Sequence, residues 1–265
     1  MNAEMNGRER SIGIALSGGA VRGAAHVGVL RVLASAGLDP CCIAGTSVGA
    51  VVGAAWAAGH SADELERLFS TLDWGSLVRP TLKLTRSLMD TRRLAKLYSK
   101  RLGLTTFEAL KTPFAAVACD LTRGERVVFT EGDLVQAVRA SSALPGLFPS
   151  EQVEGRVLVD GGVVDYLPVE AARALGARTV VAVDLLPIGN RPRRIGNLFE
   201  IWYRSVYLMI RANHPSVGED CIMIRPDVAD FSFTDFKEVP ELIRRGEEAA
   251  RVALPEILRL QEEIS

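Results

Sequence analysis

The chain alternates between short apolar runs and longer stretches with helical spacing. Ser11–Leu16 and Thr179–Leu185 are apolar at nearly every position, a pattern typical of strands that are buried on both faces. Val21–Ala36 instead places its apolar residues on one side of a helix, which is expected to end at Gly37. Because strands and helices alternate in this way, the sequence predicts one α/β unit with a mostly parallel sheet.

The same criteria predict the remaining elements. Strands are expected at 41–44, 114–121, 126–130, 156–159 and 221–224, and helices at 47–58, 61–72, 134–142, 168–175, 197–210 and 240–260. Ser61 and Glu64 form a capping box at the start of one helix, and Asp133 is expected to cap another. Pro255 is expected to interrupt the last helix. Residues 187–196 are expected to form a linker or flexible loop.

Composition narrows the class of protein. The chain has 265 residues, of which 48% are hydrophobic, and its formal net charge is −1. This apolar fraction excludes a disordered chain, and four cysteines are too few for a disulfide framework. The balanced charge gives no reason to expect nucleic acid as a partner. We expect one domain over residues 11–262, preceded by a short tail at 1–10.

No targeting or membrane-spanning segment is expected. The N-terminal residues are not followed by the apolar region of a signal peptide. The longest uncharged stretch, Cys41–Gly59, is broken by four glycines, and its continuous apolar part is shorter than the ~20 residues that a membrane span needs. We therefore expect a cytoplasmic protein whose cysteines are reduced and pack as small hydrophobic side chains.

A G-x-S-x-G motif lies between a predicted strand and a predicted helix. It consists of Gly45, Ser47 and Gly49 with Thr46 and Val48 between them. In this context the serine lies on a tight turn, where the flanking glycines remove side chains that would clash. The following helix points its partial positive end at the hydroxyl. Ser47 is therefore the candidate nucleophile; the alternative is a turn that only connects the strand to the helix.

A second glycine-rich turn follows the first predicted strand. Gly18, Gly19 and Ala20 precede Arg22 and Gly23, where a helix begins. Such a turn presents backbone N–H groups that can hold a phosphate or a developing oxyanion. A dinucleotide-binding loop is disfavoured because Ala20 occupies the position of the middle glycine of the G-x-G-x-x-G pattern.

A serine nucleophile needs a base, and the histidines fit this role poorly. His26 lies within a predicted helix and is expected to pack in the core, whereas His60 is expected in an exposed turn. His214 satisfies the chain order of a Ser–Asp–His triad, but the elbow follows only two strands, too early for an α/β-hydrolase. Asp160 ends a predicted strand and is followed by two glycines, Gly161 and Gly162, which leave its carboxylate sterically accessible.

Together, the three motifs resemble those of the patatin-like phospholipases, especially the small bacterial members related to neuropathy target esterase. The matching text is LSGGAVRGAAHVGVLRVL, AGTSVGAVVGA, ASSALPGLFPS and DGGVVDYLPVEAARALGA, and the C-terminal text from residue 230 is also similar. The resemblance implies a single three-layer α/β/α domain. It also implies a lipid acyl hydrolase of the phospholipase A or lysophospholipase type that acts on a lipid or ester substrate and needs no metal or organic cofactor.

The resemblance further implies a role for each motif residue. Ser47 would be the nucleophile and Asp160 the general base. Backbone N–H groups of Gly18, Gly19 and Ala20 would form the oxyanion hole, and the residues supporting these loops would be Arg22, Gly23, Gly45, Gly49, Gly161 and Gly162.

The sequence departs from the family pattern at two places. Ala20 stands where a third glycine is usual, so a positive φ there would be costly. Asp165 and Tyr166 stand where the family often has asparagines. Some small relatives are adaptors rather than enzymes, so a non-catalytic binding module on the same fold is the alternative from another class.

Two further segments suggest contact with lipid. Lys83–Arg101 carries seven basic residues and one acid, so it could contact anionic headgroups at the inner membrane surface, although a solvated helix face explains it more simply. The aromatic helix with Trp202, Tyr203 and Tyr207 could line an acyl cleft or form a lid over residues 187–212, or it could pack in the core.

Overall fold

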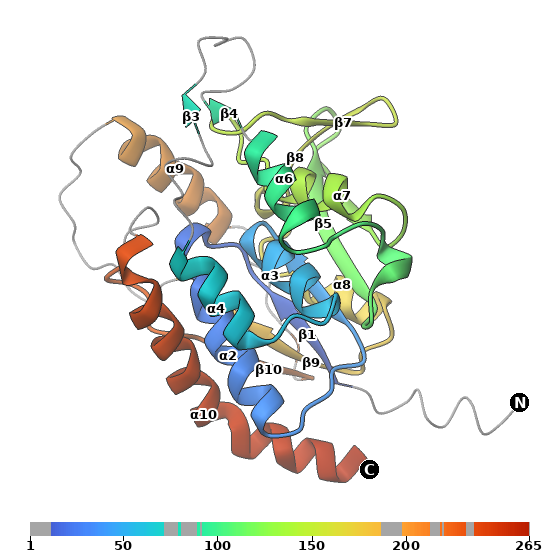
Figure 1. Ribbon diagram of the computed structural model, residues 1–265, viewed down its shortest axis with the longest axis vertical. Coiled ribbons are helices and arrows are strands. Elements are labelled where there is room, and N and C mark those ends of the chain that lie inside the picture. Colours follow the sequence, from blue (N-terminus) through green and yellow to red (C-terminus); the bar gives the residue numbers. More distant parts are fainter. Residues whose placement is uncertain are drawn as a thin grey trace, which may run out of the picture.

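The computed structural model describes residues 12–71, 79–80, 89–90, 92–186, 198–212, 218, 220–231 and 236–264 (Figure 1). Its central sheet has eight strands in the order β10-β9-β1-β2-β5-β8-β7, with β6 paired to β5. The strands are β1 (Ile12–Leu16), β2 (Ile43–Thr46), β5 (Phe114–Asp120), β6 (Glu125–Phe129), β7 (Glu151–Val153), β8 (Arg156–Asp160), β9 (Thr179–Val183) and β10 (Cys221–Ile224). A separate pair consists of β3 (Arg79–Pro80) and β4 (Met89–Asp90).

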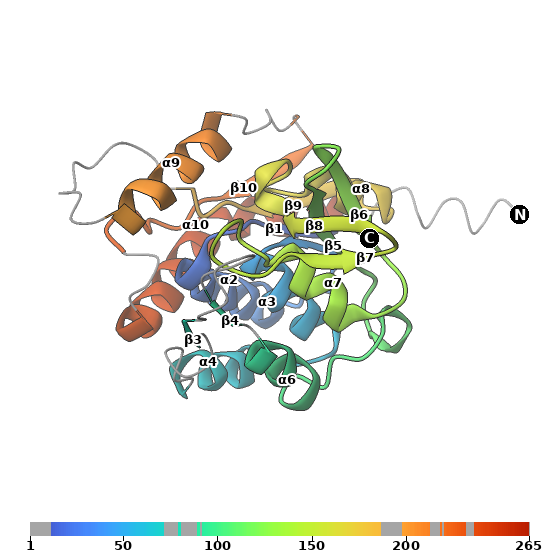
Figure 2. The same cartoon turned by 90° about the horizontal axis from the view of Figure 1, so that it is seen from above.

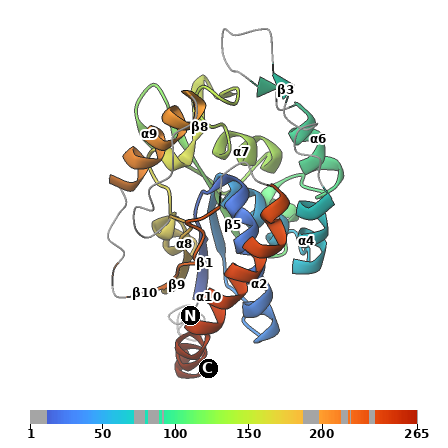
Figure 3. The same cartoon turned by 90° about the vertical axis from the view of Figure 1, so that its left-hand side faces the viewer.

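Helices cover both faces of this sheet. The helices are α2 (Ala24–Ser35), α3 (Val48–Ala57), α4 (Ala62–Thr71), α6 (Arg92–Lys100), α7 (Leu134–Ser141), α8 (Val169–Ala174), α9 (Leu198–Ala212) and α10 (Val239–Ile264). Short 3₁₀ turns are η1 (Ala20–Gly23), η2 (Phe107–Ala109), η3 (Gly161–Val163) and η4 (Phe236–Glu238). Figure 3 shows α8 and α9 on one side of the strands and α2 and α10 on the other. The predicted α/β domain with a mostly parallel central sheet is confirmed.

The alternation of side chains along each strand divides the core in two. In β1, Ile14 and Leu16 pack with α2, α3 and α10, whereas Ala15 packs with α8. Small residues dominate the second side, where Cys42, which precedes β2, and Ala44 of β2 lie against α8. Because both faces are covered, these strands are apolar without alternation, as the sequence pattern predicts.

The antiparallel part of the sheet is built around β5. One edge of β5 pairs with β6, and the opposite edge pairs first with parallel β2 and then with antiparallel β8. β2 ends where Thr46 pairs with Val117, and β8 ends where Asp160 pairs with Ala118, the next residue of β5. The ends of β2 and β8 therefore meet along the same edge of β5.

Most local predictions agree with the structure, and the exceptions have physical reasons. The capping box and the Asp133 cap both form: Ser61 N–H donates to Glu64 Oε2 at 2.8 Å, and Gln136 N–H donates to Asp133 Oδ1 at 2.9 Å. The predicted interruption at Pro255 is wrong, because α10 continues through it. Pro255 is exposed, so the carbonyl that loses its helical partner can be hydrated, and the buried Ile257 holds the helix beyond it.

Other predictions fell short or lie outside the described residues. The sequence criteria missed β7, which is only three residues long. Cys41 and Cys221 are half-buried rather than fully buried. Residues 1–10 and 187–196 lie outside the described part of the chain, as does His214, and the limits of the domain at residues 11 and 262 stay a prediction.

Candidate active site

Ser47 occupies a strained turn between β2 and α3. Its φ of 56° and ψ of −124° are unusual for a residue with a side chain. Gly45 and Gly49 permit this turn, because a Cβ on Gly45 would lie 2.4 Å from the Gly49 carbonyl oxygen, and one on Gly49 would lie 2.2 Å from the Leu16 carbonyl oxygen. The motif therefore forms the elbow that its sequence context predicts.

Two serines at the C-terminal end of α7 hold the backbone of this elbow. The Ser47 N–H donates to Ser141 Oγ at 2.9 Å, and Ser142 Oγ lies 3.3 Å from the Ser47 carbonyl oxygen. The sequence criteria assigned no role to these serines. The only signal was their place in ASSALPGLFPS, a segment that lies far from the elbow in the sequence.

Asp160 lies beside Ser47 and is 4% exposed. Its carboxylate accepts hydrogen bonds from the Ser47 side chain and from the Gly162 N–H, the latter at 2.8 Å. Burial raises the pKa of Asp160 to about 6, although both hydrogen bonds oppose the shift by stabilising the carboxylate. Asp160 is thus a stronger base than an exposed aspartate and is still ionised near pH 7.

The two glycines after Asp160 allow its close approach to the sheet. A Cβ on Gly161 would lie 2.2 Å from the Val117 carbonyl oxygen of β5, and one on Gly162 would lie 3.1 Å from Asp160 Oδ1. The turn η3 can therefore fold directly against β5, which keeps Asp160 next to the end of β2.

The glycine-rich loop after β1 lies next to the elbow. A Cβ on Gly18 would lie 3.5 Å from Cβ of Ser47. The prediction that Gly18 supplies an oxyanion donor is wrong for this structure, because its N–H donates to the Tyr166 carbonyl oxygen at 3.2 Å. Within the described part of the chain, the N–H groups of Gly19 and Ala20 donate to no protein acceptor. These two groups are the candidate donors.

Ala20 adopts the conformation that the sequence comparison identified as costly. Its φ is 52°, in the left-handed region that glycine favours. The alanine therefore keeps the N–H donor of the family glycine while its Cβ strains the turn.

Arg22 connects the loop to the rest of the molecule. Its Nε and Nη2 donate to the Phe231 carbonyl oxygen at 3.1 and 2.9 Å, and its guanidinium carbon lies 5.7 Å from the centre of the Tyr207 ring on α9. Gly23 packs under the elbow helix, because a Cβ there would lie 2.2 Å from the Val48 side chain. Both residues thus fix the direction in which α2 leaves the loop.

The two residues that depart from the family pattern also make contacts at the site. Tyr166 Oη donates to the Gly18 carbonyl oxygen at 2.7 Å. Asp165 forms an ion pair with Arg126 at 2.9 Å, and its carbonyl oxygen accepts from Thr46 Oγ1 at 2.9 Å. The segment after Asp160 therefore binds to both the glycine-rich loop and the elbow.

The described histidines contact backbone carbonyl groups rather than the Ser47 hydroxyl. His26 is buried, as predicted, and its Nε2 lies 2.9 Å from the Ser17 carbonyl oxygen. Burial lowers the pKa of His26 to about 4, so the ring is neutral at pH 7 and donates this hydrogen bond. His60 is half-buried rather than exposed, because its Nε2 contacts the Leu102 carbonyl oxygen at 3.0 Å.

The described residues offer neither a metal site nor a membrane-spanning helix. No group of three or more His, Cys, Asp or Glu side chains in this part of the chain is arranged to hold a metal ion. Among its helices, none combines the length and the apolar character needed to cross a membrane.

The fold and the elbow together define an α/β protein with a serine–aspartate pair at the ends of its strands. The family model described as patatin-like phospholipase matches residues 14–173. The chain belongs to the patatin-like phospholipase family.

Curated relatives agree with this assignment. The chain is 30% identical over 283 residues to an uncharacterized NTE family protein of Mycobacterium tuberculosis, covering 94% of this chain and 48% of that protein. It is 33% identical over 278 residues to patatin-like phospholipase domain-containing protein 7 of Rattus norvegicus, covering 89% of this chain and 20% of that one. The chain therefore spans about half the length of the mycobacterial relative and a fifth of the rat protein.

The crystal structure of VipD from Legionella pneumophila shares the fold, with a TM-score of 0.57 and 13% identity over 93% of this chain and 67% of that one. The type III effector protein ExoU aligns with a TM-score of 0.50 and 14% identity over 94% of this chain and 53% of that one.

Proposed function

We propose that this protein is a serine lipid acyl hydrolase that uses Ser47 as nucleophile and Asp160 as general base. The observation that carries the proposal is the hydrogen bond between the Ser47 side chain and the buried Asp160 carboxylate, formed on a strained elbow. A structural turn has no need of a buried carboxylate on its serine. Membership of the patatin-like phospholipase family supports lipid esters as the substrate class.

In the acylation step, Ser47 Oγ attacks the ester carbonyl carbon while Asp160 accepts the hydroxyl proton. The oxyanion that forms accepts hydrogen bonds from the Gly19 and Ala20 N–H groups. When the carbonyl re-forms, the bond to the alcohol breaks, and the alcohol leaves with the proton from Asp160. The product is an acyl-serine.

Deacylation repeats the same steps with water. Asp160 accepts a proton from the water as its oxygen attacks the acyl carbon, and it returns that proton to Ser47 Oγ as the acyl bond breaks. A fatty acid and the free enzyme result. Neither step requires a metal or an organic cofactor.

The substrate proposed is a phospholipid or lysophospholipid carboxylic ester. The alternative is a binding module on the same fold, which would need neither the strained serine nor the buried carboxylate. A Ser–Asp–His esterase that uses His214 is the second alternative, and it would require the imidazole to reach Asp160.

The test is the hydrolysis of a p-nitrophenyl ester and of a phospholipid by folded variants. We expect Ser47→Ala and Asp160→Asn each to lower kcat/KM by at least 100-fold, whereas the exposed controls Ser35→Ala and Asp39→Asn stay within twofold of wild type. Activity of either site variant within a few-fold of wild type would contradict the pair. His214→Ala should be nearly silent, and a loss of two or more orders of magnitude would favour the triad.

A fluorophosphonate probe separates the enzyme from the binding module. Labelling of wild type but not of Ser47→Ala supports a nucleophilic serine. The absence of labelling in a correctly folded wild type, together with no turnover of any ester, would favour the binding module.

Membrane contact through Lys83–Arg101 stays a separate proposal. Within the described part of this segment, α6 buries Leu94, Leu97 and Tyr98 and exposes Lys96 and Lys100. Salt-sensitive co-sedimentation with anionic vesicles would support this proposal, and a lack of salt-sensitive binding would leave the segment as the solvated helix face that explains it more simply.

A further inference from the structure

The helix α9 presents apolar side chains to the solvent. Ile201, Leu208 and Met209 are 49%, 57% and 59% exposed. With Ser205 they follow the spacing of one helix face, and we call Ile201, Leu208 and Met209 the α9 stripe. A helix that lies on the surface of a soluble domain normally exposes polar residues along this face. The α9 stripe is therefore a surface for a partner rather than for water alone.

The inner face of α9 adjoins the candidate active site. Ile210 Cδ1 lies 3.6 Å from the position of a Cβ on Gly162, two residues after Asp160. Tyr207 lies over Arg22 of the oxyanion loop. Val163 of η3 is also partly exposed, so apolar surface continues from the α9 helix toward Asp160.

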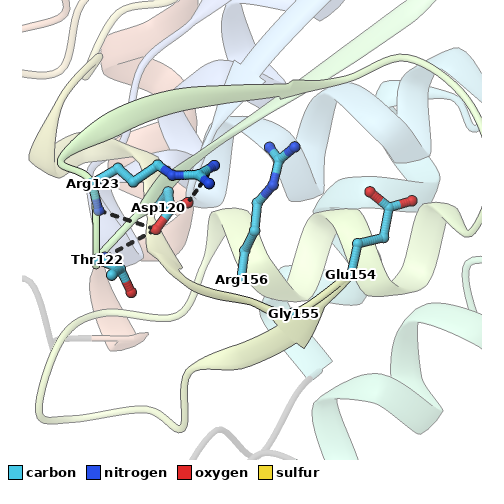
Figure 4. Close-up of a pocket in the computed structure, with 6 residues that line it drawn as sticks. All are labelled: Asp120, Thr122, Arg123, Glu154, Gly155 and Arg156. Atoms are coloured by element: carbon cyan, nitrogen blue, oxygen red, sulfur yellow. Dashed lines mark hydrogen bonds and ion pairs between the residues drawn. The ribbon is translucent and has the colours of Figure 1, made fainter.

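A charged pocket lies at the same end of the molecule as α9. Figure 1 places α9 and the β7–β8 hairpin at the same end of the molecule, and Figure 2 views this end from above. A pocket between the β5–β6 turn and that hairpin is lined by Asp120, Thr122, Arg123, Glu154, Gly155 and Arg156 (Figure 4).

The two arginines of this pocket differ in their partners. Arg123 pairs with Asp120 at 3.9 Å, whereas Arg156 forms no ion pair with any described residue and is exposed. Leu121, which follows Asp120 in the sequence, is a further exposed apolar residue at this end. The charges of this pocket balance, because Asp120 and Glu154 offset the two arginines. The features that favour a bilayer are therefore the exposed apolar face of α9 and its position beside Asp160, since acyl chains accept apolar side chains at a membrane surface.

We propose that the α9 stripe docks on the surface of a lipid bilayer and so brings the Ser47–Asp160 pair to its substrate. This inference rests on the proposed lipid hydrolase function, because a lipid substrate resides in such a surface. A second copy of the chain fits less well, since three partly exposed side chains supply much less than the ~800 Å² per partner of a standard protein interface.

The experiment measures the binding of Ser47→Ala protein to extruded vesicles, so that hydrolysis cannot alter them. Vesicles of phosphatidylcholine with 30% phosphatidylserine are used at low salt and at 0.5 M NaCl, and the bound fraction is measured by flotation. Leu208→Asp with Met209→Asp is compared with Val252→Asp, which changes an 84%-exposed valine on α10, the helix that packs against α2. Circular dichroism and gel filtration verify the fold and the oligomeric state of each variant.

We expect the α9 double variant to lower the vesicle partition coefficient at least tenfold at both salt concentrations, and Val252→Asp to change it less than twofold. Because exposed positions are changed, folding should be preserved; if the double variant unfolds, Leu208→Ser alone should lower partitioning at least threefold. The inference would be overturned if the α9 substitutions left the vesicle binding of the Ser47→Ala protein unchanged, or if that protein did not bind vesicles at all. A wild-type dimer that the variants dissociate without lipid would assign the stripe to a second copy instead.

Failure of this inference is distinguishable from failure of the proposed function. Turnover of a soluble p-nitrophenyl ester by wild type without vesicle binding refutes the docking surface alone. Vesicle binding that depends on the α9 stripe, without turnover of any ester, refutes the hydrolase alone.

Discussion

Tyr166 and Gly18 are joined by two hydrogen bonds in opposite directions. Tyr166 Oη donates to the Gly18 carbonyl oxygen at 2.7 Å, and the Gly18 N–H donates to the Tyr166 carbonyl oxygen at 3.2 Å. The segment that follows Asp160 is thereby attached to the loop that carries the candidate oxyanion donors. Base and donors are thus held by one connected piece of backbone and side chain.

Replacing Tyr166 by phenylalanine tests this attachment. The variant removes the hydroxyl from a buried site, and among the described residues the Gly18 carbonyl then keeps only the Ser17 hydroxyl at 3.1 Å as a donor. We expect Tyr166→Phe to lower the free energy of unfolding by about 1 kcal/mol and kcat by about tenfold, with a smaller effect on KM. Chemical denaturation and steady-state kinetics on a soluble ester measure both. A kcat within twofold of wild type would show that the hydroxyl does not position the loop.

The pH dependence of turnover should report Asp160. The carboxylate must be ionised to accept the Ser47 proton, and burial raises its pKa to about 6. We therefore expect kcat/KM to rise about tenfold per pH unit below pH 6 and to level off above it. A pH–rate profile from pH 4.5 to 8 checks this, and His214→Ala should leave the fall of kcat/KM at low pH unchanged. If kcat/KM fell only near pH 4, burial would not have raised the pKa of Asp160.

The same pKa shift predicts that the Asp160→Asn variant is more stable than wild type. The pKa of Asp160 is raised from an ordinary value of 3.8 to about 6, so the folded state binds the proton more tightly than the unfolded state. The associated stability is present below pH 3.8 and is lost as the pH rises through 6. Asparagine stays neutral, so Asp160→Asn should exceed wild type by up to about 3 kcal/mol at pH 8 and match it near pH 3.5. Urea unfolding at both pH values measures this, with exposed Asp39→Asn as the control that should show no such difference.

Close backbone packing at the elbow gives a further prediction. A Cβ on Gly49 would lie 2.2 Å from the Leu16 carbonyl oxygen, which belongs to the central strand β1 and cannot move easily. Gly49→Ala should lower the free energy of unfolding by about 3 kcal/mol or more and abolish activity. Gly37→Ala is the matched control: its φ is +78° but nothing lies near the added Cβ, so strain alone should cost about 1 kcal/mol. If both variants lost the same free energy of unfolding, the backbone around Gly49 would have moved to relieve the clash.

The sequence predicted the parts of the site that depend on local structure. A nucleophile elbow follows from the glycines around Ser47 and from the order of strand, turn and helix, all of which are contiguous in the sequence. The apolar runs likewise predicted the parallel strands, because each run is contiguous in the sequence. Ala20 could be identified as a costly position because one backbone conformation is needed at that turn.

The remaining features depend on contacts between distant segments. Nothing local indicates that β8 follows β2 along one edge of β5, although this pairing places Asp160 beside Ser47. The Gly18 N–H could not be excluded as a donor, because its acceptor is the main chain of Tyr166, 148 residues away. Ser141 was missed similarly, since its hydroxyl accepts from the Ser47 N–H across a helix packing contact.

The strain at Ala20 leads to a last prediction, in which activity and stability separate. Ala20 and Glu154 are both residues with side chains in the left-handed region, at φ of 52° and 50°. Ala20→Gly and Glu154→Gly should each raise the free energy of unfolding by about 0.5–1 kcal/mol, because the relief of strain exceeds the added entropy of the unfolded chain. Ala20→Gly keeps the N–H donor, so its kcat should stay within threefold of wild type. Ala20→Val should be less stable than wild type, because a branched side chain is costly at this φ. Its kcat should fall at least tenfold, because the side chain displaces the N–H donor. Thermal unfolding and ester hydrolysis measure the three variants together. A destabilised Ala20→Gly beside a stabilised Glu154→Gly would mean that the methyl group of Ala20 contributes packing that outweighs its strain.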